Sequence, residues 1–292
     1  AAMATTAPTV TPGSGVYPQV QSTVTITGDA GNQFYFTTDG SNPSNLSTPY
    51  TVPVAIGNTA VIKAIAYASG VPSSITTSRI QSDITTLPVP RNGLMLWLKG
   101  DFGPVLSGSN ITQWSDLSSS SPANDATQGT AANQATLVSP SINGFPGGSF
   151  NGSSRRYALA NQFTDLTGGF SIFAVIKPVG TATKTLFASG NAGPANLISL
   201  ETVNTQVRLT AMNASTTSNV ITATGALTVG KYQLVDAVHT GTGTASISVN
   251  GSNLISGSVQ NLLNVARTSN FVGSNIGQTI FWNGELADLL IY

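Results

Sequence analysis

The sequence predicts an all-β protein made of two sandwiches, a small one followed by a larger one. Short runs rich in Val, Ile, Thr and aromatic residues recur along the chain, separated by turns rich in Gly, Pro, Asn and Asp. Hydrophobic residues make up 40% of the 292 residues and charged residues only 8%, a balance that excludes disorder as the main state. A chain of this length has room for two domains.

The clearest strand pattern lies at residues 231–252 (KYQLVDAVHTGTGTASISVNGS). An apolar run at 234–238 is followed by the turn TGTG, and residues 245–249 then alternate apolar and polar side chains. Asn250-Gly251 favours a second tight turn, because both residues tolerate positive φ. We expect a hairpin at the centre of a large antiparallel sandwich.

Composition excludes several classes of partner. The 11 Lys and Arg residues balance 11 Asp and Glu residues, so no electrostatic footprint for nucleic acid or an anionic membrane exists. No run of about 18 apolar residues occurs, so we expect no membrane span. Cysteine is absent, so burial of the core must supply the stability. The small residues of the N-terminus resemble what remains after removal of a signal peptide, and we expect an extracellular or cell-surface protein.

Residues 1–12 are small, polar and interrupted by proline, which predicts a flexible N-terminal arm. Two interpretations stay open. The arm is either a disordered tail, or it adds a strand to a neighbouring subunit through Thr9, Val10 and Thr11.

Residues 13–84 contain several short strands at close spacing, which predicts a small Ig-like or fibronectin-like sandwich. The blocks FYFTTDGSNPS, STPY and KAIA resemble, in this order, a chitobiase/β-hexosaminidase C-terminal-type module. The resemblance implies a spacer or accessory domain of a secreted carbohydrate-active or surface protein. We interpret Asp39, directly before Gly40, as a turn-capping residue. Residues 85–92 (TTLPVPRN) carry two prolines and predict a short, semi-rigid linker.

Residues 93–292 resemble a laminin-G-like, concanavalin A-like lectin jelly roll. The resemblance is carried by LMLWL near the start, then by WSD, ATQ, NGF and FNG, and finally by the closing strand NGELADLLIY. It implies a large antiparallel sandwich in which Trp97 and Trp114 take core positions. Lys99-Gly100-Asp101 and the segment NGSSRR after Phe150 depart from the acidic pattern of the family. These departures leave a calcium site without a carboxylate cluster, so we predict no metal and no cofactor.

Catalytic chemistry is not indicated. Glycoside hydrolysis uses a pair of carboxylates held close together. Only Glu285 and Asp288 are neighbours in the sequence, and a spacing of three on a regular strand predicts opposite faces. The single histidine, His239, follows an apolar strand with no nucleophile motif nearby, and we interpret it as a strand-end residue. The sequence therefore predicts a protein that is not an enzyme.

Sugar binding requires aromatic faces and planar polar side chains. Two clusters offer this chemistry outside the expected core: Trp282 with Asn283, and Arg155-Arg156-Tyr157. The alternatives are packing within the sheet for Trp282 and a solvated strand start for the arginines.

The sequence thus predicts a secreted or surface-displayed, non-catalytic glycan-binding or adhesion protein whose partner is a glycan or cell-surface polysaccharide. The alternative is a structural subunit of an extracellular filament or virion. Such a subunit would self-associate through its N-terminal arm and display a lectin-like domain. Low charge and the extended-prone arm favour that alternative.

Overall fold

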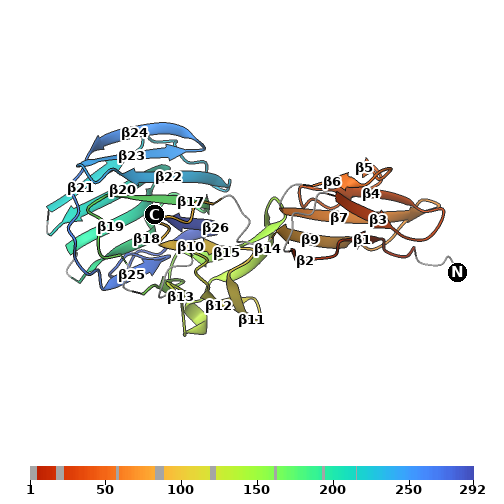
Figure 1. The fold of residues 1–292 in the computed structure, drawn as a ribbon, viewed down its shortest axis with the longest axis horizontal. Coiled ribbons are helices and arrows are strands. Elements are labelled where there is room, and N and C mark those ends of the chain that lie inside the picture. The colour runs from red at the N-terminus through yellow and green to blue at the C-terminus, as the bar shows by residue number, and fades with distance from the viewer. Residues whose placement is uncertain are drawn as a thin grey trace. The chain divides into compact units, whose positions relative to one another are not determined.

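The computed structural model describes residues 5–17, 23–56, 59–82, 89–118, 123–160, 163–192, 195–214 and 216–292, and it confirms the predicted all-β class (Figure 1). The chain forms two compact units. One comprises Ala1–Pro90 with Asn143–Phe145, and the other comprises Arg91–Ile142 with Pro146–Tyr292. Residues 85–88 of the predicted linker lie outside the described residues, and its boundaries stay a prediction. Within the described ranges, no helix is long and apolar enough to cross a membrane.

The first unit pairs two small sheets around its own core. One sheet has the order β1 (Thr9–Thr11), β3 (Thr23–Thr27), β6 (Val54–Ala55). The other has the order β2 (Gly15–Tyr17), β9 (Thr76–Ser82), β7 (Thr59–Ala68), β4 (Gln33–Thr37), β5 (Thr48–Pro49), with β8 (Val71–Pro72) beside β7. The buried side chains between them are Val10, Val24, Ile26, Val54, Ile62, Ala64 and Ile80. This arrangement agrees with the small sandwich expected from the sequence.

The predicted assembly arm is part of this sandwich. Strand β1 pairs with β3 of the same chain, with Val10 opposite Ile26, and Val10 is only 5% exposed. The hydroxyl of Thr76 donates to the carbonyl oxygen of Pro8, which fixes the segment from its other side. Thr9, Val10 and Thr11 therefore pair within their own domain, where β1 is an edge strand of its sheet, and a role for them in joining a neighbouring subunit stays a prediction.

Two antiparallel layers form the second unit (Figure 1). The first layer runs β10 (Leu96–Lys99), β26 (Asn283–Ile291), β17 (Phe170–Pro178), β22 (Gln233–His239), β23 (Thr244–Val249), β24 (Ser252–Ser258). The second runs β13 (Ala126–Thr127), β16 (Tyr157–Ala158), β25 (Ser269–Val272), β18 (Lys184–Asn191), β19 (Ala195–Val203), β20 (Gln206–Asn213), β21 (Thr216–Ile221). The remaining elements are β11 (Pro104–Ser107), β12 (Asn110–Trp114), the 3-10 turn η2 (Ala131–Asn133), β14 (Thr136–Ile142) and β15 (Phe145–Asn151). Strands β22 and β23 are the hairpin predicted at residues 231–252.

Strict alternation builds the core between these layers. Along β17 every second side chain is buried, and Ile172, Ala174 and Ile176 all belong to the main core. Trp114 lies in the same core, and Trp97 is buried as well, as the sequence predicts.

The last strand breaks the alternation once. The register between β17 and β26 shifts, so that Val175 faces Asp288 while the next residue, Ile176, faces Leu286. Ala287 is therefore an extra residue on β26, as in a β-bulge. Directly opposed residues share a face, so Glu285 and Asp288 lie on the same face of the sheet, away from the main core. The prediction that they lie on opposite faces was wrong because it assumed a regular strand.

Candidate functional site

Two of the predicted sugar-binding residues lie in the core. Trp282 is fully buried and belongs to the main hydrophobic cluster, so its ring offers no face to a ligand. Tyr157 is fully buried too. Its hydroxyl donates to the carbonyl oxygen of Ile111 at 2.7 Å and accepts from the amide of Ala135 at 2.8 Å. Burial raises the pKa of this phenol. The prediction of Trp282 and Tyr157 as binding residues is corrected by their burial.

The other three predicted residues hold turns together. Arg155 donates to the carbonyl oxygen of Ser149 at 2.9 Å, and Arg156 donates to that of Ser154 at 3.1 Å. Asn283 donates to the carbonyl oxygen of Val179 at 2.8 Å. All three side chains are partly exposed, and a binding role for them stays a prediction.

A pocket of about 460 Å³ lies elsewhere in the second unit, over β19, β25 and the loop that follows β25. Its lining combines apolar, hydroxyl, amide and carboxylate groups. The lining residues are Ala192, Leu197, Ser199, Glu201, Ser269, Asn275, Ile276 and Gly277.

Alternation along β19 explains how this strand serves both the core and the pocket. Ile198 and Leu200 belong to the main core. Successive side chains of a strand point to opposite faces, so the residues between and beside them, Leu197, Ser199 and Glu201, face the pocket.

The one carboxylate in the lining is already paired. Glu201 lies opposite Arg208 of β20, and its Oε2 accepts hydrogen bonds from Arg208 Nε at 2.8 Å and Nη2 at 2.5 Å. Its Oε1 accepts from the hydroxyl of Thr185 on β18 at 3.2 Å. Two bonds from one guanidinium fix the carboxylate and offset its charge.

Two serine hydroxyls of the lining have no such partner. Ser199 lies opposite Ala188 of β18, and Ser269 lies opposite Gly190 of the same strand, so β18 separates the two serines. Neither hydroxyl makes a hydrogen bond within the part of the chain that the structure describes. Each is therefore free to donate to and accept from a ligand.

The loop after β25 forms a fixed wall of the pocket. The side-chain oxygen of Asn275 accepts from the amides of Thr279 at 2.8 Å and Ile280 at 3.0 Å, while its Nδ2 donates to the Thr279 hydroxyl at 3.1 Å. These bonds close the loop on itself. Asn275 thus holds Ile276 and Gly277 in place at the lining and has little capacity left for a ligand.

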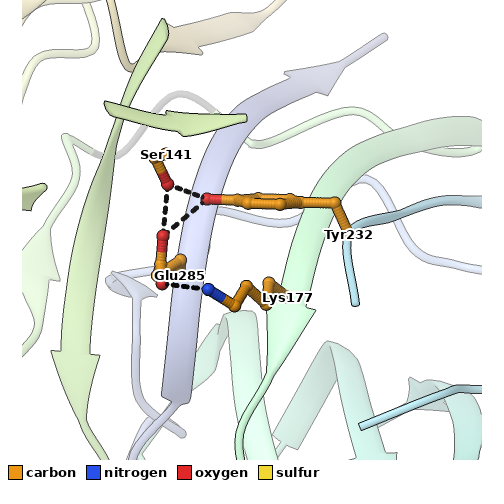
Figure 2. A network of polar contacts seen from close by, with 4 residues as sticks. All are labelled: Ser141, Lys177, Tyr232 and Glu285. Atoms are coloured by element: carbon orange, nitrogen blue, oxygen red, sulfur yellow. Dashed lines mark hydrogen bonds and ion pairs between the residues drawn. The ribbon is translucent and has the colours of Figure 1, made fainter. Parts of the chain in front are cut away.

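A separate polar network joins β14, β17, β26 and Tyr232, which directly precedes β22 (Figure 2). Glu285 accepts from Lys177 at 2.7 Å, from the hydroxyl of Tyr232 at 2.8 Å and from the hydroxyl of Ser141, and the two hydroxyl oxygens also contact each other. Burial alone would raise the pKa of Glu285, but these hydrogen bonds and the charge of Lys177 outweigh it and hold the pKa below its usual range. Three donors keep this carboxylate ionised, so it holds the neighbouring strands together and does not serve as a proton donor.

Asp288, the second acid on this face of β26, is more buried than Glu285. Asp288 accepts a hydrogen bond from the indole nitrogen of Trp97 at 2.8 Å and lies opposite Lys99 on β10. Burial raises the pKa of Asp288 to about 6, against the attraction of Lys99 and the hydrogen bond from Trp97. Lys99 itself is paired with Asp101.

The pocket was not predicted from the sequence, and Glu201, Ser199 and Ser269 were not among the predicted site residues. The alternating segment ISLE at residues 198–201 carries the available signal, because it places Ser199 and Glu201 on one face. No part of the sequence near Ser269 indicates that it reaches the same place. Across the described ranges, no group of three or more His, Cys, Asp or Glu side chains is placed to hold a metal ion.

Comparison with solved structures finds domains of similar fold at low identity. The binding domain of Paraclostridial Mosquitocidal Protein 1 aligns with a TM-score of 0.51 and 12% identity, over 69% of this chain and 49% of that one. Domain 4 of AbnA, a GH43 extracellular arabinanase from Geobacillus stearothermophilus solved with arabinotriose, aligns with a TM-score of 0.49 and 18% identity, over 68% and 91%. The binding domain of Botulinum neurotoxin DC, solved with rat synaptotagmin II, aligns with a TM-score of 0.44 and 13% identity, over 69% and 48%.

The chain thus spans about half the length of the toxin binding domains that it matches. No curated protein sequence matches it. Two protein families do. Residues 12–78 match the chitobiase/beta-hexosaminidase C-terminal domain, and residues 151–292 match the concanavalin A-like lectin/glucanases superfamily in its laminin-G-like branch. The chain therefore carries a chitobiase/β-hexosaminidase C-terminal domain followed by a domain of the concanavalin A-like lectin/glucanase superfamily.

Proposed function

We propose that this protein is a secreted or surface-displayed, non-catalytic glycan-binding protein, and that the pocket over β19 and β25 holds the sugar. One observation carries the proposal. The hydroxyls of Ser199 and Ser269 have no partner within the described residues, and they share the pocket with the apolar side chains of Leu197 and Ile276.

A sugar suits this combination of groups. Each pyranose presents a face of C–H groups, which apolar side chains cover, and a rim of hydroxyls, which both donate and accept hydrogen bonds. Two free serine hydroxyls match such a rim, and Leu197 with Ile276 match the C–H face. The volume of about 460 Å³ falls within the range of small-molecule sites.

The arrangement of the acidic side chains supports sugar binding without hydrolysis. Glycosidases of the common types use two carboxylates, one on each side of the scissile bond. Glu201 is the one acid among the lining residues, and Arg208 and Thr185 occupy it. Glu285 and Asp288 share a face of β26, but Glu285 is tied to Lys177 and Asp288 is bonded to Trp97. The descriptions of both matching families name carbohydrate-active or lectin proteins, which supports a glycan as the partner.

The alternative function is a filament or virion subunit assembled through its N-terminal arm. Its main support was an arm without a place in its own domain. Residues 9–11 pair with β3 of their own chain, and Val10 fills the core of the first unit. Residues 9–11 could be donated to a neighbour only by leaving β3 and removing Val10 from the core of the first unit.

A glycan array followed by calorimetry on the best glycan tests the proposal. We expect the wild type to bind a glycan, and we expect the double variant Ser199→Ala with Ser269→Ala to bind it at least tenfold more weakly. Ser256→Ala, which removes an exposed hydroxyl from β24, is the matched control and should bind like the wild type.

Absence of any bound glycan would overturn the proposal. Unchanged affinity in the double serine variant would show that the sugar binds outside the pocket. Release of shorter sugars from the bound glycan would show that the protein is a catalyst.

A further inference from the structure

We propose that the pocket over β19 and β25 selects uncharged sugars and rejects both acidic and basic ones. This inference rests on the proposed function, because it specifies the chemical class of glycan at the same site. It follows from how Glu201, Arg208 and Thr185 are arranged around the two free serine hydroxyls.

Acidic sugars are disfavoured because the lining offers no free cation. Glu201 is the one charged residue among the described lining residues, and its carboxylate is already paired with Arg208. A uronate or sialate in this volume would place its carboxylate beside this pair, where no unengaged cation of the described lining receives it. The carboxylate would then lose water without gaining a partner, which costs free energy.

Basic sugars are disfavoured because the carboxylate is already engaged. Arg208 donates twice to Oε2 of Glu201, and Thr185 donates once to Oε1. The ammonium group of an amino sugar would have to compete with the guanidinium and the threonine hydroxyl for a carboxylate whose charge Arg208 already offsets. The planar fork of arginine holds a carboxylate better than a single ammonium does. The pair is held in register by the backbone, since Glu201 and Arg208 are directly opposed on β19 and β20.

Neutral groups remain to make the contacts. Ser199 lines the pocket, and its hydroxyl has no hydrogen-bond partner among the described residues, so it can donate to and accept from a neutral hydroxyl of a ligand. The bonds of Asn275 to Thr279 and Ile280 are made before any ligand arrives, so the wall that carries Ile276 is preorganised. A preorganised neutral pocket discriminates by hydroxyl pattern, not by charge attraction.

Matched sets of methyl glycosides test the selectivity. We suggest glucose, glucuronic acid and glucosamine, and the corresponding galactose set, titrated at pH 7 into the isotope-labelled full chain. Chemical shifts of the backbone amides at 275–280 report occupancy of the pocket. We expect the neutral member of at least one set to bind, and its acidic and basic counterparts to bind at least tenfold more weakly.

Two substitutions should relax the selectivity in opposite directions. Glu201→Gln frees the guanidinium of Arg208 to pair with an acidic ligand, so the acidic glycoside should gain at least fivefold in affinity while the neutral one changes little. Arg208→Gln frees the carboxylate, so the basic glycoside should gain instead. Glu285→Gln removes an acid of the same sandwich that is outside the pocket lining, and it should leave the selectivity unchanged. If one of the two pocket variants folds poorly, the other still tests whether the Glu201–Arg208 pair controls the selectivity.

The outcomes separate this inference from the proposed function. A charged glycoside that shifts the 275–280 amides as strongly as its neutral counterpart would overturn the selectivity and leave glycan binding intact. Binding of a glycan with no shift at these amides would overturn the pocket as the site. A full chain that binds no glycan of any kind would overturn the proposed function itself.

Discussion

Glu285 and Asp288 occupy the same face of β26, and their surroundings shift their pKa in opposite directions. Three donors surround Glu285, so its charged form is favoured in the folded protein. Asp288 has lost most of its water, and the indole of Trp97 with the neighbouring Lys99 compensates only in part. Each shift is a statement about stability, because the folded and unfolded chains bind protons differently.

Asp288 should destabilise the folded protein at neutral pH. Its folded-state pKa of about 6 lies above the ordinary value of 3.8, so stability falls as pH rises from the lower value through the higher one. We expect Asp288→Asn, which keeps an acceptor for Trp97, to stabilise the second unit by about 1–3 kcal/mol at pH 7.5. Urea unfolding at several pH values measures this gain. The gain should vanish near pH 4, and a variant that is less stable at pH 7.5 would contradict the expectation.

Glu285 should act in the opposite sense. Its pKa is lowered in the folded state, so its contribution to stability is present above the ordinary value of 4.5 and is lost as pH falls through the folded-state value. We expect Glu285→Gln to cost about 1–2 kcal/mol at pH 7, discounted for the partial exposure of Lys177. The same urea titrations measure the cost, which should shrink toward pH 3. A cost that is independent of pH would assign the effect to packing alone.

Among the elements, β1 shows how three residues can complete a domain. Its alternation places Val10 in the core of the first unit and leaves Thr9 and Thr11 exposed. Main-chain bonds to β3 then cover an edge that would otherwise invite pairing with another chain.

Truncation of Val10 should therefore weaken the first unit without changing assembly. We expect Val10→Ala to cost about 1–3 kcal/mol, from lost burial and the cavity left behind. Thr9→Ala, at an exposed position of the same strand, should cost less than about 0.5 kcal/mol. Unfolding curves give both values. Light scattering should show the same mass for both variants and the wild type. A change of mass in Val10→Ala alone would show that β1 takes part in self-association.

The whole molecule consists of two units with separate cores. Among the described residues, the core of the first unit comes from residues 10–80, and that of the second comes from residues from 95 onward. The proposed sugar pocket and both carboxylates of β26 belong to the second unit.

Residues 91–292 alone should therefore fold and keep any glycan binding of the full chain. We expect their thermal transition to lie within a few degrees of the corresponding transition of the full chain, since none of their core side chains is lost. Circular dichroism and calorimetry with the glycan found for the full chain make the comparison. Loss of β-structure in the shorter chain would show that the two units depend on each other.

The sequence by itself determined the all-β class, the order of a small and a large sandwich, and the hairpin at residues 231–252. These features depend on local rules, because alternation of period two selects strands and Asn-Gly or Thr-Gly pairs select turns. The burial of Trp97 and Trp114 was predicted as well, from a family pattern.

Only the tertiary structure decided which side chains meet. One extra residue at Ala287 reverses the facing of every residue before it on β26, and no local pattern announces that insertion. Trp282 and Tyr157 carry the chemistry of sugar binding, but burial depends on the layer packed against them. Ser199 and Ser269 lie far apart in the chain and flank the same strand, because β18 pairs with both β19 and β25. Residues from several strands line the pocket together, so the order of the strands in the sheet determines it and no single segment of sequence does.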